Sequence, residues 1–237
     1  MKIQQVDRNR FLVTTKRYRD KVTSDWFDSK VLAEQGAIIG HSTGRSTTWF
    51  FQQQDEQFVL RKYYRGGILS KWVEDSYLFT GLKRTRAYRE LSLLKKMYKK
   101  GLPVPEPVAL MVDKNGFTYR ASIIIGLIKN AQDLFHVLRQ RSLSADEWKA
   151  VGALVKQFHD KGVYHSDLNI HNILLDAQGR FWVIDFDKGR LMSNKSTKLE
   201  TNLARLQRSL RKELSKFSDF NWQESDWEHL VKGYYGN

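Results

Sequence analysis

Apolar residues recur at helical spacing in three parts of the chain, within residues 85–99, 144–162 and 201–217. Residues three or four positions apart lie on one face of a helix, so each segment predicts a helix with one buried side. The second also begins with a capping box, Ser144 with Glu147, and ends at Lys161-Gly162. The inward positions are Ala87, Leu91, Leu94 and Tyr98; then Trp148, Val151, Val155 and Phe158; then Leu203, Leu206, Leu210 and Leu214.

Short runs rich in β-branched and aromatic residues predict strands between these helices. Residues 40–53 are typical of two strands joined by a tight loop at Gly44, and residues 57–64 and 118–125 predict two more. Residues 173–176 and 181–186 flank the turn 177–180 and predict a hairpin. All three prolines lie in residues 101–107, which must therefore be extended and separate a helix from a strand.

The first half of the chain is thus mostly strands with one helix, and the second half is mostly helices around a hairpin. This distribution predicts an α+β protein of two lobes with a hinge near residues 125–128. We place the N-terminal lobe at residues 1–126 and the C-terminal lobe at residues 127–237.

Composition narrows the chemistry. A hydrophobic content of 41% with 13% aromatic residues is that of a globular protein, and 237 residues can bury a proper core. The absence of cysteine excludes disulfides, thiol nucleophiles and cysteine-ligated zinc. Residues 1–11 are too polar for a signal peptide, and the most apolar stretch, 123–128, is too short to cross a bilayer. We therefore expect a soluble protein that is at most peripheral to a membrane.

Charge is the unusual property of this sequence. Forty Lys and Arg against 26 Asp and Glu give a net charge of +14, which favours a polyanionic partner. Nucleic acid, an anionic membrane surface and a phosphorylated substrate all fit this excess.

Polar residues with catalytic chemistry gather in residues 164–190. Asp167 and Asn172 lie five positions apart in a polar loop, and Asp185 ends an apolar strand. Phosphoryl transfer needs a carboxylate to orient the attacking hydroxyl and oxygen ligands for the metal that neutralises phosphate charge. The alternative is that these residues only cap turns and strand ends.

The sequence His165-Ser166-Asp167…Asn172 followed by Ile184-Asp185-Phe186 resembles the catalytic loop and metal-binding motif of the protein-kinase-like superfamily. More narrowly, the segments 60–67, Thr85-Arg86-Ala87…Glu90 and 165–169 together resemble the 3-deoxy-D-manno-octulosonic acid (Kdo) kinases. The resemblance spans about residues 40–187 and implies a two-lobed protein-kinase-like fold that binds ATP and Mg²⁺.

The resemblance also implies roles for single residues. Asp167 would be the catalytic carboxylate, and Asn172 and Asp185 would bind Mg²⁺. His165 would support the loop rather than act in catalysis. Glu90 would pair with a basic residue of the strand 57–64, although it could also be an ordinary exposed helix carboxylate.

The basic partner of Glu90 is either Arg61 or Lys62. Strand alternation places Arg61 on the face opposite Phe58 and Leu60, which have the character of core residues, so Arg61 is favoured to face the phosphates. Most of the superfamily uses lysine there, which keeps Lys62 open. The loop at Gly44 would cover the phosphates, or be a plain hairpin turn.

The acceptor is a small molecule or a sugar on this interpretation. The chain ends too soon after Asp185 for an activation segment and a peptide-docking lobe, and no proline follows Pro107 to form the Ala-Pro-Glu motif of protein kinases. The resemblance implies ATP-dependent phosphorylation of the 4-hydroxyl of Kdo in a Kdo-lipid A precursor during lipopolysaccharide core biosynthesis. It also implies peripheral contact with an anionic membrane at the cytoplasmic face of the bacterial inner membrane.

Three rivals remain on the sequence alone. A lipopolysaccharide heptose kinase or a RIO-like atypical protein kinase would use the same site on another acceptor. A nucleic-acid-binding pseudokinase would account for the charge without turnover, but it needs no intact set of Asp167, Asn172 and Asp185. We therefore expect no nucleic acid partner.

Overall fold

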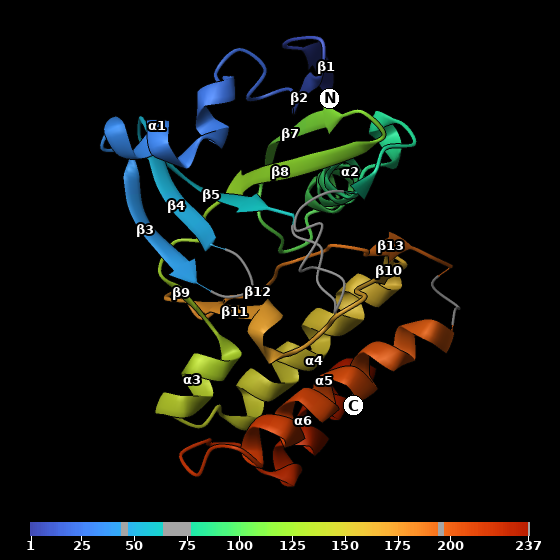
Figure 1. Cartoon of the computed structure of the whole chain (residues 1–237). Helices are drawn as coiled ribbons and strands as arrows, with labels where there is room; N and C mark the ends of the chain where they lie inside the picture. Colours follow the sequence, from blue (N-terminus) through green and yellow to red (C-terminus); the bar gives the residue numbers. More distant parts are fainter. Residues whose placement is uncertain (44–46, 64–76, 194–196, 237) are drawn as a thin grey trace. The chain divides into compact units, whose positions relative to one another are not determined.

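A computed structural model describes residues 1–43, 47–63, 77–193 and 197–236 (Figure 1). The chain divides into two compact units: the first combines residues 1–98 with 105–127, and the second combines residues 99–104 with 128–237. The predicted boundary after residue 126 lies beside this division, but residues 99–104, which we had placed in the first lobe, belong to the second unit.

The first unit is built on a sheet of eight strands whose neighbouring strands all run antiparallel. Its order is β1-β2-β7-β8-β5-β4-β3, with β6 paired to β8 outside this path. The predicted strands β3, β4, β5 and β8 are all present, whereas the sequence pattern did not predict β1, β2, β6 or β7. The strands are β1 Lys2–Gln5, β2 Arg10–Thr14, β3 Ile38–Thr43, β4 Thr47–Gln53, β5 Glu56–Lys62, β6 Tyr77–Leu78, β7 Pro107–Asn115 and β8 Thr118–Gly126.

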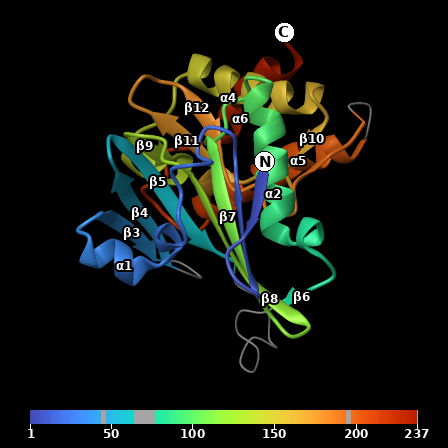
Figure 2. The same cartoon turned by 90° about the horizontal axis from the view of Figure 1, so that it is seen from above.

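Helix α2 (Arg86–Lys99) lies along this sheet beside β7 and β8 (Figures 1 and 2). Of the predicted stripe, Ala87, Leu91 and Leu94 are buried, but Tyr98 is 44% exposed and Met97 is buried instead. The expectation for Tyr98 was therefore wrong, because the buried face also draws in Leu93 and Met97. The smaller helical segments of this unit are η1 Ser24–Phe27, α1 Ser29–Glu34 and η3 Leu82–Arg84.

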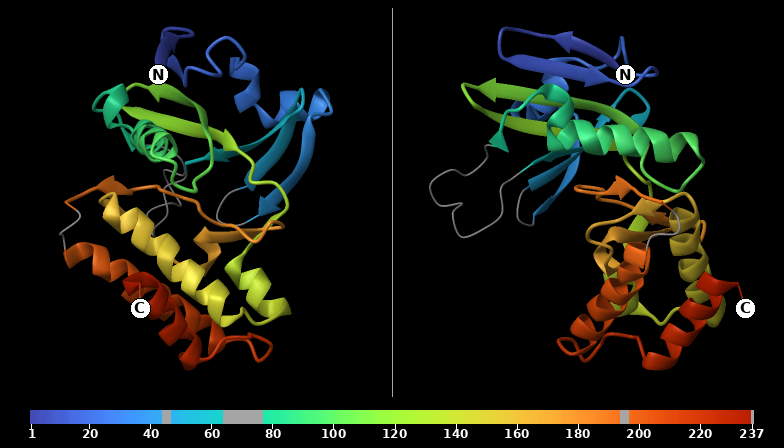
Figure 3. Two further views of the ribbon diagram at one scale, coloured as in Figure 1. Left: turned by 180° about the vertical axis from the view of Figure 1, so that it is seen from behind. Right: turned by 90° about the vertical axis from the view of Figure 1, so that its right-hand side faces the viewer.

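The second unit is mostly helical (Figure 3). The predicted capping box of α4 is present, since Ser144 and Glu147 exchange both hydrogen bonds, and its predicted inner face is buried. In α5, Leu203, Leu206 and Leu210 are buried, but Leu214 is 39% exposed, contrary to expectation, because it is the last residue of the helix. The helices are α3 Leu134–Gln140, α4 Ala145–Asp160, η4 Ile170–Asn172, η5 Thr197–Leu199, α5 Glu200–Leu214 and α6 Glu224–Tyr235.

Short strands complete the second unit. The predicted hairpin forms between β11 (Ile173–Asp176) and β12 (Phe181–Val183), although β12 is shorter than the expected 181–186. Strand β9 (Ala131–Asp133) pairs with β11, and β10 (Val163–Tyr164) pairs with β13 (Arg190–Leu191). The early end of β12 frees residues 184–187 to meet the polar loop that follows β10. A strand-rich unit and a helical unit make the α+β, two-lobed protein-kinase-like fold that the sequence predicted.

Candidate active site

The polar loop 165–172 of the second unit is organised by His165. This side chain is 3% exposed, and its Nε2 lies 2.9 Å from the carbonyl oxygen of Ile184. Its Nδ1 lies 3.1 Å from the backbone nitrogen of Asp167. Since a backbone N–H can only donate, Nδ1 must accept and Nε2 must carry the proton that goes to Ile184. A neutral imidazole thus joins Asp167 to the residue before Asp185. This geometry agrees with the expectation that His165 holds the loop in place rather than acting in catalysis.

Asn172 makes a second connection between the same two segments. Its Nδ2 donates to the carbonyl oxygen of Asp167 at 2.9 Å, and its own carbonyl accepts from the backbone nitrogen of Ile184 at 3.0 Å. The hydroxyl of Ser166 donates to the carbonyl of Asp187 at 2.7 Å. Asp185 itself has a φ of 59°, a left-handed conformation that few non-glycine residues adopt. The structure therefore ties the backbones around the three predicted site residues, Asp167, Asn172 and Asp185, into one hydrogen-bonded unit.

The carboxylate of Asp167 is exposed and faces a cation. Its side chain is 65% exposed, and its Oδ1 lies 3.4 Å from Nη1 of Arg205 on α5. An exposed pair at this distance contributes little to stability. It does place a positive charge beside the carboxylate. The sequence predicts a basic face on this helix that is either solvated or in contact with a substrate or membrane, but helical periodicity does not reveal which arginine of the face lies next to a loop.

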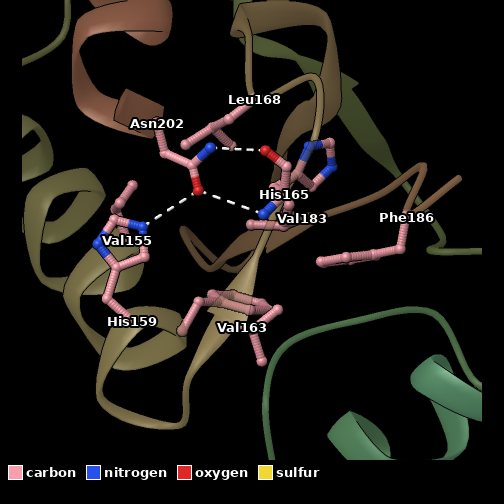
Figure 4. Close-up of a pocket in the computed structure, with 9 residues that line it drawn as sticks. Val155, His159, Val163, His165, Leu168, Val183, Phe186 and Asn202 are labelled. Carbon is pink, nitrogen blue, oxygen red and sulfur yellow. Dashed lines mark hydrogen bonds between the residues drawn. The ribbon is translucent and has the colours of Figure 1, made fainter. Parts of the chain in front are cut away.

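A buried hydrogen-bond network lies behind the loop and centres on Asn202 of α5 (Figure 4). Asn202 holds both backbone groups of His165: its Nδ2 donates to the carbonyl at 2.6 Å, and its Oδ1 accepts from the N–H at 3.2 Å. The same Oδ1 lies 3.2 Å from Nε2 of His159 on α4, whose Nδ1 lies 2.8 Å from the hydroxyl of Tyr234 on α6. Three helices thus fix the backbone of one loop residue. Sequence reasoning missed Asn202, His159 and Tyr234. The signal that could have found Asn202 was its position as a polar residue beside the apolar stripe of the segment 201–217.

The two buried histidines make stability depend on pH. Burial, which disfavours the imidazolium, lowers the pKa of His165 against the opposing hydrogen bond to Ile184, and it likewise lowers the pKa of His159 against its contact with Asn202. Both rings therefore stay neutral in the folded protein at a pH at which the unfolded chain already binds protons.

We expect the free energy of unfolding to fall as pH decreases below about 6.5, the ordinary histidine pKa. Each histidine contributes a slope of up to about 1.4 kcal/mol per pH unit until the pH reaches its lowered pKa. Urea unfolding at several pH values measures this slope, from neutral pH down to the pH at which carboxylates begin to bind protons. His159→Gln should reduce it, and an equal slope in that variant would contradict the assignment.

In the first unit, Arg61 of β5 pairs with Glu90 of α2. Nη2 of Arg61 lies 2.5 Å from Oε1 of Glu90, whose side chain is 2% exposed, and the hydroxyl of Tyr63 donates to Oε2 at 2.5 Å. The reading of Glu90 as an ordinary exposed carboxylate is therefore wrong, because α2 turns it towards β5. Phe58 and Leu60 are buried, as strand alternation required.

Lys62 lies on the other face of β5. There it lines a polar cavity whose other residues come from β2, η1, the N-cap of α1, and β7. The geometry therefore favours Arg61 over Lys62 as the partner of Glu90. The loop at Gly44 lies outside the described residues, as does the segment 64–67. The other residues of the cavity are Arg10, Ser24, Phe27, Asp28, Met111 and Asp113.

We expect Arg61→Met to destabilise the protein by roughly 2–4 kcal/mol. The substitution removes a charged partner from the buried carboxylate of Glu90, while the hydrogen bond from the hydroxyl of Tyr63 remains. Lys62→Met is the matched control on the same strand, and we expect a change below about 1 kcal/mol. Urea unfolding of both variants distinguishes the two positions. Equal losses of stability in the two variants would contradict the role of Arg61 as the partner of Glu90.

The sequence that forms this site also matches a known protein family. The model of the lipopolysaccharide kinase (Kdo/WaaP) family matches residues 29–234, which is most of the chain. The chain belongs to this family. Every residue of the polar loop, the Arg61–Glu90 pair and the Asn202 network lies inside the matched range.

Relatives within the lipopolysaccharide kinase family carry a more specific name. A 3-deoxy-D-manno-octulosonic acid kinase of Vibrio cholerae is 40% identical over 218 residues, covering 86% of this chain and 92% of the relative. One of Photobacterium damsela subsp. piscicida is 45% identical over 202 residues, covering 83% and 84%. One of Mannheimia succiniciproducens is 41% identical over 216 residues, covering 88% and 89%. The resemblance inferred from the motifs is confirmed.

The fit of the site to a metal follows from its donor atoms. Within the described residues, no three His, Cys, Asp or Glu side chains form a metal-binding group. The predicted set differs from such a group, because it combines two aspartates with the amide of Asn172. The contact from Nδ2 to Asp167 leaves Oδ1 as the atom that Asn172 can offer to a cation. Carboxylate and amide oxygens are the donors that Mg²⁺ prefers, so these residues fit this ion.

Proposed function

We propose that this protein transfers the γ-phosphoryl group of ATP to the 4-hydroxyl of Kdo in a Kdo-lipid A precursor, a step of lipopolysaccharide core biosynthesis. Membership of the lipopolysaccharide kinase family and relatives that are named Kdo kinases support this proposal. The observation that carries it is the hydrogen-bonded unit around Asp167, in which His165 and Asn172 fix the loop to the segment that contains Asp185.

Asp167 is the catalytic carboxylate of this proposal. It accepts a hydrogen bond from the acceptor hydroxyl and so directs that oxygen towards the phosphorus atom. Its backbone is held on both sides, by His165 at the nitrogen and by Asn172 at the carbonyl, while its carboxylate remains open to solvent. A fixed backbone with an accessible carboxylate is the arrangement that orienting a substrate requires.

Asn172 and Asp185 would hold Mg²⁺ through their side-chain oxygens. When bound, this ion supplies positive charge to the phosphates of ATP. Arg61 would contact the phosphates, with its guanidinium oriented by Glu90, and the loop at Gly44 would cover them. Lys62, which lines the polar cavity on the opposite face of the sheet, takes no part in this arrangement.

The acceptor gives a reason for the charge of the protein. A Kdo-lipid A precursor carries a carboxylate and phosphates and lies in a membrane, and the net charge of +14 complements both. Among the described residues, no helix is long and apolar enough to span a bilayer. We propose peripheral contact with the cytoplasmic face of the bacterial inner membrane and no nucleic acid partner.

Phosphate transfer from labelled ATP tests this function. The acceptors are a detergent-solubilised Kdo-lipid A precursor, a heptosylated lipid and a generic protein, each with and without Mg²⁺. We expect label only in the Kdo lipid, only with Mg²⁺, and at the 4-hydroxyl by NMR of the product. Label in heptose or in protein would indicate a heptose kinase or a RIO-like kinase. RNA binding without any phosphate transfer would indicate a pseudokinase.

A further inference from the structure

One end of the sheet in the first unit gathers three separate segments: the β1–β2 turn, the β7–β8 turn and strand β6. The backbone nitrogen of Lys114 donates to the carbonyl of Asn9 at 2.8 Å, and that of Phe79 donates to the carbonyl of Phe117 at 2.8 Å. Figure 2 shows β6 beside β8 at this end. We call residues 6–10, 77–84 and 113–120 the sheet-end surface.

The two most exposed large apolar side chains of the described residues are neighbours on this surface. Phe117 is 85% exposed and Leu78 is 70% exposed. Leu78 is paired with Thr118, the residue after Phe117, in the β6–β8 ladder. Val6 of the β1–β2 turn adds a third apolar side chain, 39% exposed. Single exposed apolar residues are ordinary, whereas strongly exposed apolar residues on adjoining backbone segments are the start of the apolar patch from which an interaction site is built.

The turn that presents Phe117 does not require an aromatic residue. Strands β7 and β8 pair up to Asn115 and Thr118, so the turn consists of Gly116 and Phe117 alone. Gly116 has a φ of 56°, which accounts for the glycine, and a small polar residue is the usual choice next to it. A polar residue would therefore serve this turn as well as Phe117 does.

The surroundings of this apolar tip are cationic. The sheet-end surface holds six Lys or Arg and two Asp. Both aspartates are engaged within the surface: Asp113 pairs with Arg10 at 2.6 Å, and Asp7 accepts hydrogen bonds from the backbone nitrogens of Asn9 and Arg10. Five cations lie outside the Arg10–Asp113 pair: Arg8, Lys83, Arg84, Lys114 and Arg120.

We propose that the sheet-end surface docks the protein on an anionic lipid bilayer. Phe117 and Leu78 enter the boundary between headgroups and acyl chains, and the surrounding cations lie at the level of the lipid phosphates. This combination of apolar insertion with basic residues is the one that binds a protein in the plane of a membrane interface. A protein partner would need a broader apolar area, and a nucleic acid would gain nothing from Leu78, which has no ring to stack on a base. The inference rests on the proposed function in one respect, that the acceptor is a membrane lipid.

Flotation with vesicles tests the docking surface. We expect the wild-type protein to float with phosphatidylethanolamine–phosphatidylglycerol vesicles and much less with phosphatidylcholine vesicles. Phe117→Ser combined with Leu78→Ser should weaken binding by about tenfold or more, because it removes the inserted apolar groups. Lys83→Gln combined with Arg84→Gln should reduce the preference for the anionic vesicles. Tyr235→Ser, at a side chain of α6 that is 61% exposed, is the matched control and should leave binding unchanged.

Three results would overturn the inference. The first is equal flotation of the Phe117/Leu78 double variant and the wild type. The second is a loss of vesicle binding in Tyr235→Ser as large as that in the double variant. The third is wild-type protein that binds RNA but not vesicles. Circular dichroism confirms that each variant is folded. Phe117→Trp gives an independent reading, since brominated acyl chains should quench additional fluorescence in this variant relative to the wild type.

The kinase assay separates this inference from the proposed function. The double variant should phosphorylate detergent-solubilised Kdo lipid at the wild-type rate and vesicle-embedded Kdo lipid more slowly. Vesicle docking without any phosphate transfer by the wild type would reject the function and keep the surface. Equal rates of variant and wild type on embedded lipid would reject the surface and keep the function.

Discussion

Asp167→Ala is expected to lower kcat by roughly 10²–10⁴-fold while the protein stays folded. The loss follows from the geometry of the loop. The backbone of Asp167 is fixed by His165 and Asn172, which keeps its carboxylate in the position from which it orients the acceptor hydroxyl. Stability should change by less than about 0.5 kcal/mol, because the side chain is 65% exposed and its pair with Arg205 is long. Steady-state kinetics with the Kdo lipid and thermal unfolding measure the two effects.

Asp146→Ala is the control for this prediction. Asp146 is an aspartate of α4 in the same unit, and its side chain is 89% exposed. We expect both kcat and the unfolding temperature of this variant to stay near the wild-type values. Asp167→Asn keeps the size of the side chain and removes the charge, so it should lose nearly as much activity as Asp167→Ala. Turnover near the wild-type value in either Asp167 variant would remove this residue from the catalytic role.

The sequence was most informative where chemistry and periodicity coincide. The capping box of Ser144 and Glu147 is a local pattern that only one structure satisfies, and the helix begins there. The alternation around Phe58 and Leu60 assigned Arg61 to the face of β5 that meets α2. The resemblance of the polar loop to kinase motifs led to the family. The first two of these signals lie within a few residues along the chain, and the third is a set of short motifs in a fixed order.

The missed features depend on contacts between distant segments. Asn202 reaches His165 across 37 positions, and Tyr234 reaches His159 across 75. No local pattern encodes such a pair. Strand β7 was missed for a different reason. It is buried over most of its length, so it lacks the alternation of a half-buried strand. Nothing in the local sequence distinguishes Arg205, the cation next to Asp167, from the other basic residues of α5.

The contact between α4 and α6 illustrates how such distant pairs reach the site. Helix α4 carries His159 and α6 carries Tyr234, and both belong to the chain of hydrogen bonds that ends at the backbone of His165. The two helices approach each other through two glycines, Gly152 and Gly233. A Cβ atom on Gly152 would lie 1.9 Å from the carbonyl oxygen of Leu230, and one on Gly233 would lie 2.0 Å from that of Lys149.

Gly152→Ala is therefore expected to destabilise the protein by roughly 3 kcal/mol or more. The added methyl group meets backbone atoms, which no change of side-chain rotamer can move, so one helix must shift. The gain of about 1 kcal/mol in helix propensity that alanine brings over glycine offsets only part of this cost. The unfolding temperature should fall by roughly 6–12 °C. Ala150→Ser, at an exposed position of the same helix, should cost only about 0.5 kcal/mol.

Activity below the unfolding temperature gives the second reading of Gly152→Ala. A shifted α6 would carry the hydroxyl of Tyr234 away from His159, and the support of Asn202 on the loop would loosen without any change to a site residue. We therefore expect kcat to fall in the folded variant, because the loosened loop carries Asp167 and is tied to the segment that contains Asp185. A variant as stable and as active as the wild type would show that the close approach of the two helices does not constrain the loop.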